Sequence, residues 1–211
     1  MSETDILVTA FMPFGGDSMN PTEAILVRLP AKIRGARLFK LLLPVEFKAA
    51  PEMLLDGMRR ISPAAVIMLG QAGGRSAVTP ELFGRNVMEA RIPDNAGFSP
   101  HGEPVAEGCA ETLSSTLPNE RIVGAIRALG LPAELSESAG TYVCNTLLYS
   151  ALSAAGGSLP VGFIHIPFAR EQTEGVTGRE QTPFMELSDM ERAVIAAFTS
   201  TRPAPCFMMD Q

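Results

Sequence analysis

The residue with the most suggestive chemical setting in this sequence is Cys144. It follows the small residues Ser138-Ala139-Gly140-Thr141 and falls in the opening turn of a predicted helix. The first N–H groups of a helix lack intrahelical partners and carry partial positive charge, so they favour a thiolate and could hold an oxyanion. We therefore expect the pKa of Cys144 to lie below the free-thiol value of about 8.5. The alternative is a buried structural cysteine, which the local spacing alone slightly favours.

His165 is the matching candidate for a general base, which would take the thiol proton and then protonate a leaving amine. It lies near the carboxyl end of the apolar run Val161-Gly162-Phe163-Ile164-His165-Ile166. Parallel α/β folds place their sites at that edge of the sheet. The alternative is a core histidine bonded to a backbone carbonyl. The only competitor is His101, which lies in a polar loop and is expected to be exposed.

A third group should orient the imidazole, and here the sequence leaves the choice open. The chain contains 23 aspartates and glutamates. Glu81 follows the loop after a predicted strand and could reach the same sheet edge, but a solvated charge would fit the pattern as well. Phe11 and Phe14 occur together in a glycine-containing loop. They could wall a small flat pocket or pack in the core.

The elements that must position these residues alternate along the chain. Apolar runs predict strands at 6–11, 38–45, 64–69 and 161–168, with a short one at 133–137. Helices are predicted from the Asn20 cap onward and over 50–60, 120–129, 142–155 and 187–198. Residues 70–111 carry little periodicity. This alternation predicts one domain spanning 1–211, a three-layer α/β/α fold with a twisted, mostly parallel central sheet.

Composition excludes several classes of protein. The 211 residues are 46% hydrophobic with a formal net charge of -6 and no basic stripe, which disfavours nucleic acid or anionic lipid as the main partner. The apolar runs are too short to span a bilayer, and the first residues lack the pattern of a signal peptide. Cys109, Cys144 and Cys206 have no metal-ligand spacing. Such sparse cysteines predict a reducing, cytoplasmic location.

Five segments occur in an order that resembles one known family. They are Leu7 to Phe11 continuing through Pro13-Phe14-Gly15-Gly16 to Asn20-Pro21, Gly70-Gln71-Ala72-Gly73-Gly74-Arg75, Ala90-Arg91-Ile92-Pro93-Asp94-Asn95, Ser138 to Asn145, and Phe163 to Phe168 with Glu171-Gln172. Together they span most of the chain. They resemble pyroglutamyl peptidase I, the pyrrolidone-carboxylate peptidase family.

The resemblance implies a cysteine exopeptidase that removes N-terminal pyroglutamate from peptides through an acyl-enzyme, with no metal or cofactor. It implies a homo-oligomer, a dimer or tetramer. It implies that Cys144 is the nucleophile, His165 the general base and Glu81 the group that orients the base. It also implies roles for residues around them. Arg91 would support the oxyanion, and Phe11, Phe14 and Tyr142 would flank the pyroglutamyl ring. The backbone of Gln71 would recognise the lactam amide, and Asn20 would support the loop that carries the two phenylalanines.

The segment after Glu81 departs from the family pattern. The family usually reads close to Arg-Val-Ala-Ile-Asn, whereas this chain reads Leu82-Phe83-Gly84-Arg85-Asn86, and Ala10 replaces a usual glycine. The departures leave substrate tolerance open. Two alternatives therefore remain: a homologue that binds its ligand without turnover, and one that hydrolyses another small cyclic amide.

Overall fold

The computed structural model describes residues 4–201, and its centre is a six-stranded sheet in the order β2-β3-β1-β4-β10-β5. The four inner strands run parallel to one another. They are β3 (Ala36–Leu43), β1 (Thr4–Phe11), β4 (Ala65–Gln71) and β10 (Val161–Ile166). The short edge strands β2 (Lys32–Ile33) and β5 (Thr79–Pro80) are antiparallel to their neighbours. The predicted mostly parallel sheet is confirmed.

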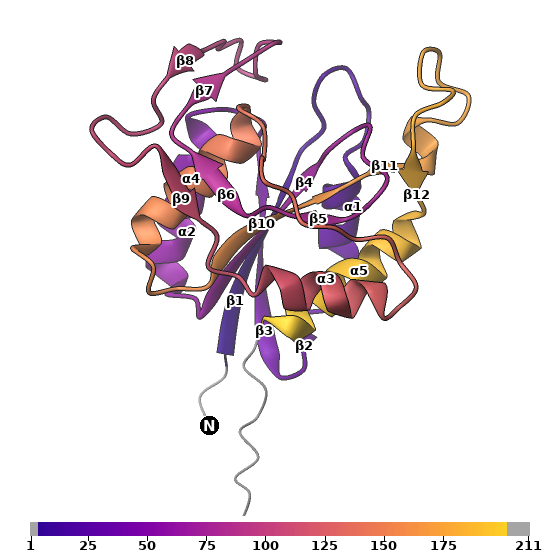
Figure 1. Ribbon diagram of the computed structural model, residues 1–211, viewed down its shortest axis with the longest axis horizontal. Helices are drawn as coiled ribbons and strands as arrows, with labels where there is room; N and C mark the ends of the chain where they lie inside the picture. Colours follow the sequence, from indigo (N-terminus) through magenta and orange to yellow (C-terminus); the bar gives the residue numbers. More distant parts are fainter. Residues whose placement is uncertain (1–3, 202–211) are drawn as a thin grey trace, which may run out of the picture.

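Helices cover both faces of this sheet (Figure 1). On one face lie α2 (Ala49–Ile61) and α4 (Val143–Ala155); on the other lie α1 (Pro21–Arg28), α3 (Asn119–Arg127) and α5 (Leu187–Ser200). Side chains of a strand alternate between faces, so a strand covered on both sides is apolar throughout. In β1, Ile6 and Val8 join the core cluster that includes α1 and α5, whereas Leu7 joins the cluster that includes α2 and α4. The three-layer α/β/α prediction is confirmed.

The predictions were wrong where elements are short. Residues 133–137 form no strand, and only the isolated bridges of Ala133 with Val78 and of Ser136 with Glu81 are present. Residues 70–111 are more ordered than their pattern indicated, because they contain β6 (Phe83–Arg85), β7 (Met88–Glu89) and β8 (His101–Glu103). β6 pairs with β9 (Thr112–Ser114), and β7 pairs with β8. Strands of two or three residues are too short to show periodicity.

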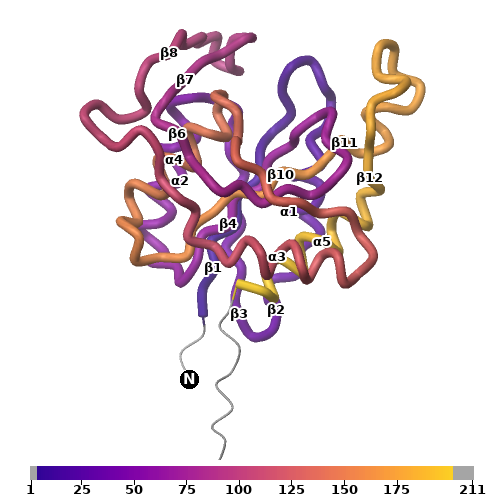
Figure 2. The backbone as a smooth tube through the Cα atoms, viewed as in Figure 1, coloured from indigo at the N-terminus to yellow at the C-terminus, as the bar shows by residue number. Residues whose placement is uncertain are grey.

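The loops that follow the parallel strands gather at one edge of the sheet. Figure 2 shows the indigo loop after β1, the magenta segment after β4 and the orange segment before α4 rising at the same end of the molecule. The segment after β10 rises there too and contains β11 (Phe168–Ala169), the short 3-10 helix η1 (Arg170–Gln172) and β12 (Phe184–Met185). Side chains distant in sequence therefore meet there. Within residues 4–201, no helix is long and apolar enough to cross a membrane.

Candidate active site

Glu81 and His165 form a buried hydrogen-bonded pair at this edge. His165 lies on β10 between Gly70 of β4 and Thr79 of β5, and Glu81 directly follows β5. The Nδ1 atom of His165 is 2.7 Å from Oε1 of Glu81. Glu81 has no exposed surface and His165 only 3%. Since an ionised carboxylate only accepts hydrogen bonds, Nδ1 carries the proton and Nε2 is left for proton transfer.

Cys144 lies in the first turn of α4, as the sequence predicted. The N-cap residue Tyr142 is extended, and no side chain caps this helix end. The next residue, Asn145, anchors the turn: its Oδ1 accepts from the N–H of Arg85 at 2.8 Å, and its Nδ2 donates to the carbonyls of Arg85 and Val87, each at 2.9 Å. Since no side chain caps α4, its first backbone N–H groups are available to a ligand beside Cys144.

The segment that departs from the family pattern packs directly behind this turn. Gly84 lies so close to α4 that a Cβ at this position would be 3.1 Å from the Cα and the N of Tyr149. A side chain there would push the strand away from the helix. The glycine therefore allows β6 to approach α4, and Asn145 joins the two. Glu81 itself keeps its place, since its N–H donates to the carbonyl of Phe163 at 2.9 Å.

Cys144 and His165 open into one cavity of about 630 Å³. Most of the residues singled out in the sequence line it: Phe14, Gln71, Arg91, Tyr142, Cys144 and His165, together with Arg75, Glu89 and Ile92 among others. The ring centroids of Phe14 and Tyr142 are 6.4 Å apart, and the Tyr142 hydroxyl donates to the carbonyl of Pro93 at 3.1 Å. The cavity therefore has an aromatic wall beside the thiol.

Phe11 and Asn20 lie behind the cavity instead of lining it. Phe11 is 2% exposed and packs against Phe163 in the core, with ring centroids 6.4 Å apart. The Nδ2 of Asn20 donates to the carbonyl of Met12 at 3.1 Å, and its Oδ1 accepts from the N–H of Thr22 at 3.0 Å. Asn20 thus joins the loop that carries Phe14 to the start of α1.

The pKa expected for Cys144 was wrong. Burial raises the pKa of the thiol to about 12, the charge of Glu81 acts in the same direction, and the charge of Arg75 and the backbone N–H of Cys144 oppose them. Helix-end effects act over a short range and are smaller than the cost of placing a thiolate among apolar side chains. The resting thiol is therefore protonated near neutral pH and needs a base.

The pKa shifts of the pair fit that requirement. Burial lowers the pKa of His165 below its ordinary 6.5, although its hydrogen bond to Glu81 opposes the shift. His165 is therefore neutral near pH 7, in the state that accepts a proton. Burial alone would raise the pKa of Glu81, but the hydrogen bond and charge of His165, with the charge of Arg75, bring it below 4.5. Glu81 is accordingly ionised.

Sequence reasoning missed two residues that hold this arrangement together. Arg75 donates from Nη1 to Oε1 of Glu81 at 2.7 Å. Gln172 donates from Nε2 to Oε1 of Gln71 at 2.8 Å and to Asp17 at 3.1 Å, which links the segment after β10 to the cavity wall. Both residues stand in segments that carried the family resemblance. Their place in those segments was the one available signal.

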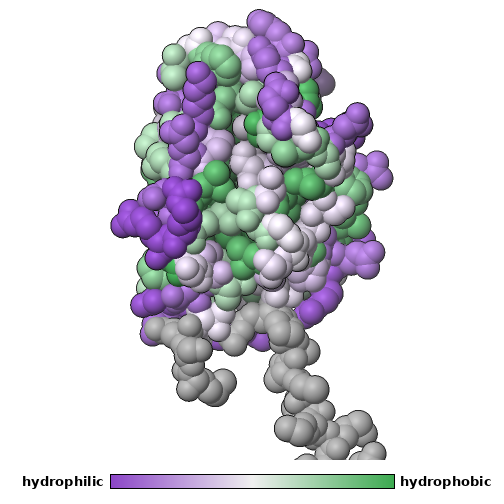
Figure 3. All heavy atoms as spheres, turned by 90° about the vertical axis from the view of Figure 1, so that its left-hand side faces the viewer, coloured by the Kyte–Doolittle hydropathy of each residue, from purple (hydrophilic) through white to green (hydrophobic). Residues whose placement is uncertain are grey.

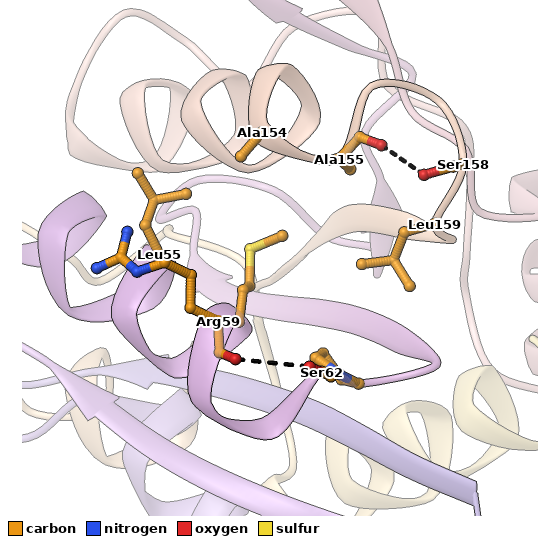
Figure 4. A pocket seen from close by; sticks show the side chains of 9 residues that line it. Leu55, Arg59, Ser62, Ala154, Ala155, Ser158 and Leu159 are labelled. Atoms are coloured by element: carbon orange, nitrogen blue, oxygen red, sulfur yellow. Dashed lines mark hydrogen bonds between the residues drawn. The ribbon is translucent and has the colours of Figure 1, made fainter.

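A second hollow lies between α2 and α4 and differs in chemistry (Figure 4). It measures about 460 Å³ and is lined by Leu55, Met58, Arg59, Ser62, Pro63, Ala154, Ala155, Ser158 and Leu159. Its serine hydroxyls donate to nearby backbone carbonyls, Ser62 to Arg59 and Ser158 to Ala155. The left-hand side of the molecule in Figure 1 mixes apolar and weakly polar side chains, with charged ones mainly toward the margins (Figure 3). The hollow between α2 and α4 offers no nucleophile–base pair.

His101 is exposed on β8, and Cys109 is exposed as well. Cys206 lies outside the described residues. Within residues 4–201, no group of three or more histidine, cysteine, aspartate and glutamate side chains could hold a metal ion.

A parallel α/β sheet with a cysteine, a histidine and a glutamate at its carboxyl edge defines the architecture of a cysteine-type hydrolase. The profile of the family described as pyroglutamyl peptidase matches residues 4–202. The chain belongs to the pyroglutamyl peptidase family.

Known proteins similar to this chain in sequence and structure match most of its length. The chain is 42% identical to the pyrrolidone-carboxylate peptidase of Lactobacillus johnsonii over 198 residues, covering 92% of this chain and 91% of that protein. It is 45% identical to the corresponding protein of Thermococcus onnurineus over 170 residues, covering 79% and 85%. The solved structure of pyroglutamyl peptidase I from Bacillus amyloliquefaciens superposes with a TM-score of 0.90 at 36% identity, covering 96% and 97% of the chains.

Proposed function

We propose that this protein removes pyroglutamate from the N-termini of peptides by nucleophilic catalysis, with Cys144, His165 and Glu81 as the reacting set. The observation that carries the proposal is the 2.7 Å contact between Glu81 and Nδ1 of His165, beside a cavity that the Cys144 side chain shares with His165. Family membership supports the reaction class. The geometry supports the particular residues.

The reaction begins with a neutral thiol, because the pKa of Cys144 is raised to about 12 by burial and by the charge of Glu81. As Sγ attacks the carbonyl carbon of the pyroglutamyl–X bond, Nε2 of His165 takes the thiol proton. The carbonyl oxygen becomes an oxyanion near the uncapped start of α4. Collapse breaks the C–N bond, and His165 gives its proton to the departing amine. Water then attacks the acyl-enzyme, losing a proton through His165, and releases free pyroglutamate and the thiol.

The cavity suits a small neutral lactam. Pyroglutamate has a flat ring with an amide and no free amine, so recognition needs apolar walls and amide-reading hydrogen bonds. Phe14 and Tyr142 supply ring faces, and the end of β4 supplies backbone at Gln71. Arg91 lines the same cavity from an exposed position and would stabilise negative charge on the reacting carbonyl. A site built on such hydrogen bonds rejects ligands that leave its polar groups unpaired.

The raised pKa of Cys144 is also what a binding protein without turnover would show. The intact pair of Glu81 and His165 favours turnover over that alternative, because a pure binding site needs no buried base beside a thiol. Action on another cyclic amide remains the second alternative. The oligomeric state, dimer or tetramer, and the cytoplasmic location remain predictions.

The test is hydrolysis of a fluorogenic L-pyroglutamyl amide by the wild type and by Cys144→Ser. The matched substrate is the L-prolyl amide, which has a similar ring but a free amine and no lactam carbonyl. We expect turnover of the first only, and its loss in the serine variant. Robust activity of Cys144→Ser would contradict the assignment of the nucleophile. If the folded wild type failed to hydrolyse the pyroglutamyl amide but hydrolysed a different cyclic amide, the assignment of the substrate would be contradicted.

A further inference from the structure

One guanidinium connects two of the three segments that carry the reacting groups, those of Glu81 and Cys144. Arg75 extends from the loop between β4 and β5, and its side chain is 28% exposed. Its Nη1 donates to Oε1 of Glu81 at 2.7 Å and also contacts the hydroxyl of Thr79, while Nη2 donates to the carbonyl of Ser138 at 3.0 Å. Ser138 precedes the turn that carries Cys144. Arg75 therefore touches the partner of the base and the approach to the nucleophile at once.

We propose that Arg75 is a positioning residue of the reaction, holding the Glu81 carboxylate against His165 and tying down the loop that leads into Cys144. This inference rests on the proposed function, since it assigns Arg75 to the same three reacting groups. Arg75 itself acts through Glu81 and Ser138, and the proposal requires no contact with the substrate.

The sharing of one carboxylate oxygen supports this role. Oε1 of Glu81 accepts from both His165 and Arg75, each at 2.7 Å, so the two donors share one carboxylate oxygen. A carboxylate buried without a cation is costly and tends to take up a proton. A protonated Glu81 could no longer fix the tautomer of His165 or stabilise its charged form. Arg75 keeps the carboxylate ionised and fixed in one orientation, and an arginine fork suits that task better than a lysine.

The positive charge of Arg75 also shifts the pKa values of the three proposed reacting groups in the same direction. It lowers the pKa of Glu81, of His165 and of Cys144. Substitution of Arg75 leaves the other charged or titratable groups around the cavity in place, and these are Glu81, Glu89, Arg91 and Tyr142. Helix α4 contributes no acidic group in its first turn. At pH values where Glu81 stays ionised, removing the positive charge should therefore raise the pKa of Cys144 and of His165.

The experiment compares Arg75→Gln and Arg75→Lys with wild type in the full-length protein. Arg59→Gln is the matched control, because Arg59 is an exposed arginine on α2 whose partner is Asp56. Each protein is assayed for kcat and KM on the pyroglutamyl amide across the pH range. The alkylation rate of Cys144 by iodoacetamide is followed by peptide mass spectrometry, which separates it from the exposed Cys109. Thermal melting verifies folding.

For Arg75→Gln we expect kcat to fall about 10- to 100-fold with little change in KM, as for loss of an interaction that acts in the transition state. The acid limb of the pH profile, which His165 sets, should move up by about half a unit or more, and Cys144 should be alkylated more slowly at a fixed pH. Arg75→Lys keeps the charge, so its acid limb should stay near that of wild type while kcat recovers only in part. Arg59→Gln should match wild type.

An unchanged kcat in Arg75→Gln would overturn the inference. A loss of kcat with the acid limb of the pH profile unmoved would also overturn it, because that result is expected of a merely structural role. These results differ from failure of the proposed function, which would appear as an inactive wild type or an active Cys144→Ser. The alkylation rates need no substrate. A Cys144 rate that is equal in wild type and Arg75→Gln would overturn the inference even if the true substrate were another amide.

Discussion

The pair proposed to move protons and the wall proposed to recognise the ring are built in opposite ways. Glu81 and His165 are 0% and 3% exposed, and both are held by the hydrogen bonds of neighbouring strands. Phe14 and Tyr142 lie on loops and are half-buried, and Arg91 is exposed. Burial of the pair fixes its geometry and shifts its pKa values, whereas loops can adjust to a ligand. The comparison predicts that substitutions in the pair change kcat and that substitutions in the wall change KM.

The largest effect is expected from His165→Ala. Removal of the base leaves a thiol that is protonated near neutral pH, so kcat should fall by about 10³-fold or more with KM little changed. The matched control is His101→Ala, because His101 is exposed on β8, outside the cavity. Steady-state kinetics on the pyroglutamyl amide provide the measurement. A loss confined to KM would place His165 in the recognition wall instead of the proton-moving pair.

Rigidity of the pair can be tested with Gly70→Ala. A Cβ on Gly70 would lie 2.5 Å from the Phe163 ring and 3.1 Å from Cδ2 of His165. Both rings would have to shift, so the free energy of unfolding should fall by about 1–3 kcal/mol, and kcat should fall with it. In Gly124→Ala the new methyl meets nothing within 4 Å, and α3 should gain up to about 1 kcal/mol. Urea unfolding measures both. Equal stability of the two variants would show that the sheet edge yields easily.

The recognition wall should respond differently. Phe14→Ala removes one aromatic face of the cavity, and the loss of about 1.5–3 kcal/mol of apolar contact should raise KM by about tenfold or more. The kcat value should change less than in His165→Ala. Phe184→Ala is the control, since Phe184 is an exposed phenylalanine on β12. If kcat fell as far as in the base variant, the wall would be part of the rigid set.

The smallest effect is expected in the acid dependence of stability. The folded-state pKa values of Glu81 and His165 lie below their ordinary values of 4.5 and 6.5. The unfolded chain therefore binds more protons, and the stability they contribute is present above these values and lost as the pH falls. The urea midpoint should drop as the pH falls below about 6.5 because of His165, and again below about 4.5 because of Glu81. Glu81→Gln should lack the second drop, which the exposed-site control Glu120→Gln should keep. If the urea midpoint depended on pH in the same way in both variants, the pKa shift assigned to Glu81 would be contradicted.

The layers of the fold and the positions of Cys144 and His165 within it could be predicted from the sequence alone. Apolar runs long enough to show a period predicted the inner strands and the main helices, and these are present. The start of α4 and the end of β10 could be located from glycine, small residues and hydrophobic spacing. The positions of Cys144 and His165 on these elements could therefore be predicted. Local patterns of this kind depend on neighbours in the chain, and these are visible in the sequence.

The other features of the site depend on contacts between segments that are distant in the sequence. Among 23 carboxylates, pairing of β5 with β10 brings Glu81 to His165, and Arg75 joins that pair through contacts that no local pattern encodes. The same packing places Phe11 behind the cavity and uses Gly84 to seat β6 on α4. The same packing buries Cys144, so its pKa is raised where the sequence predicted a lowered value. A helix start can be read from the chain, but the burial that outweighs it depends on residues that meet only after folding.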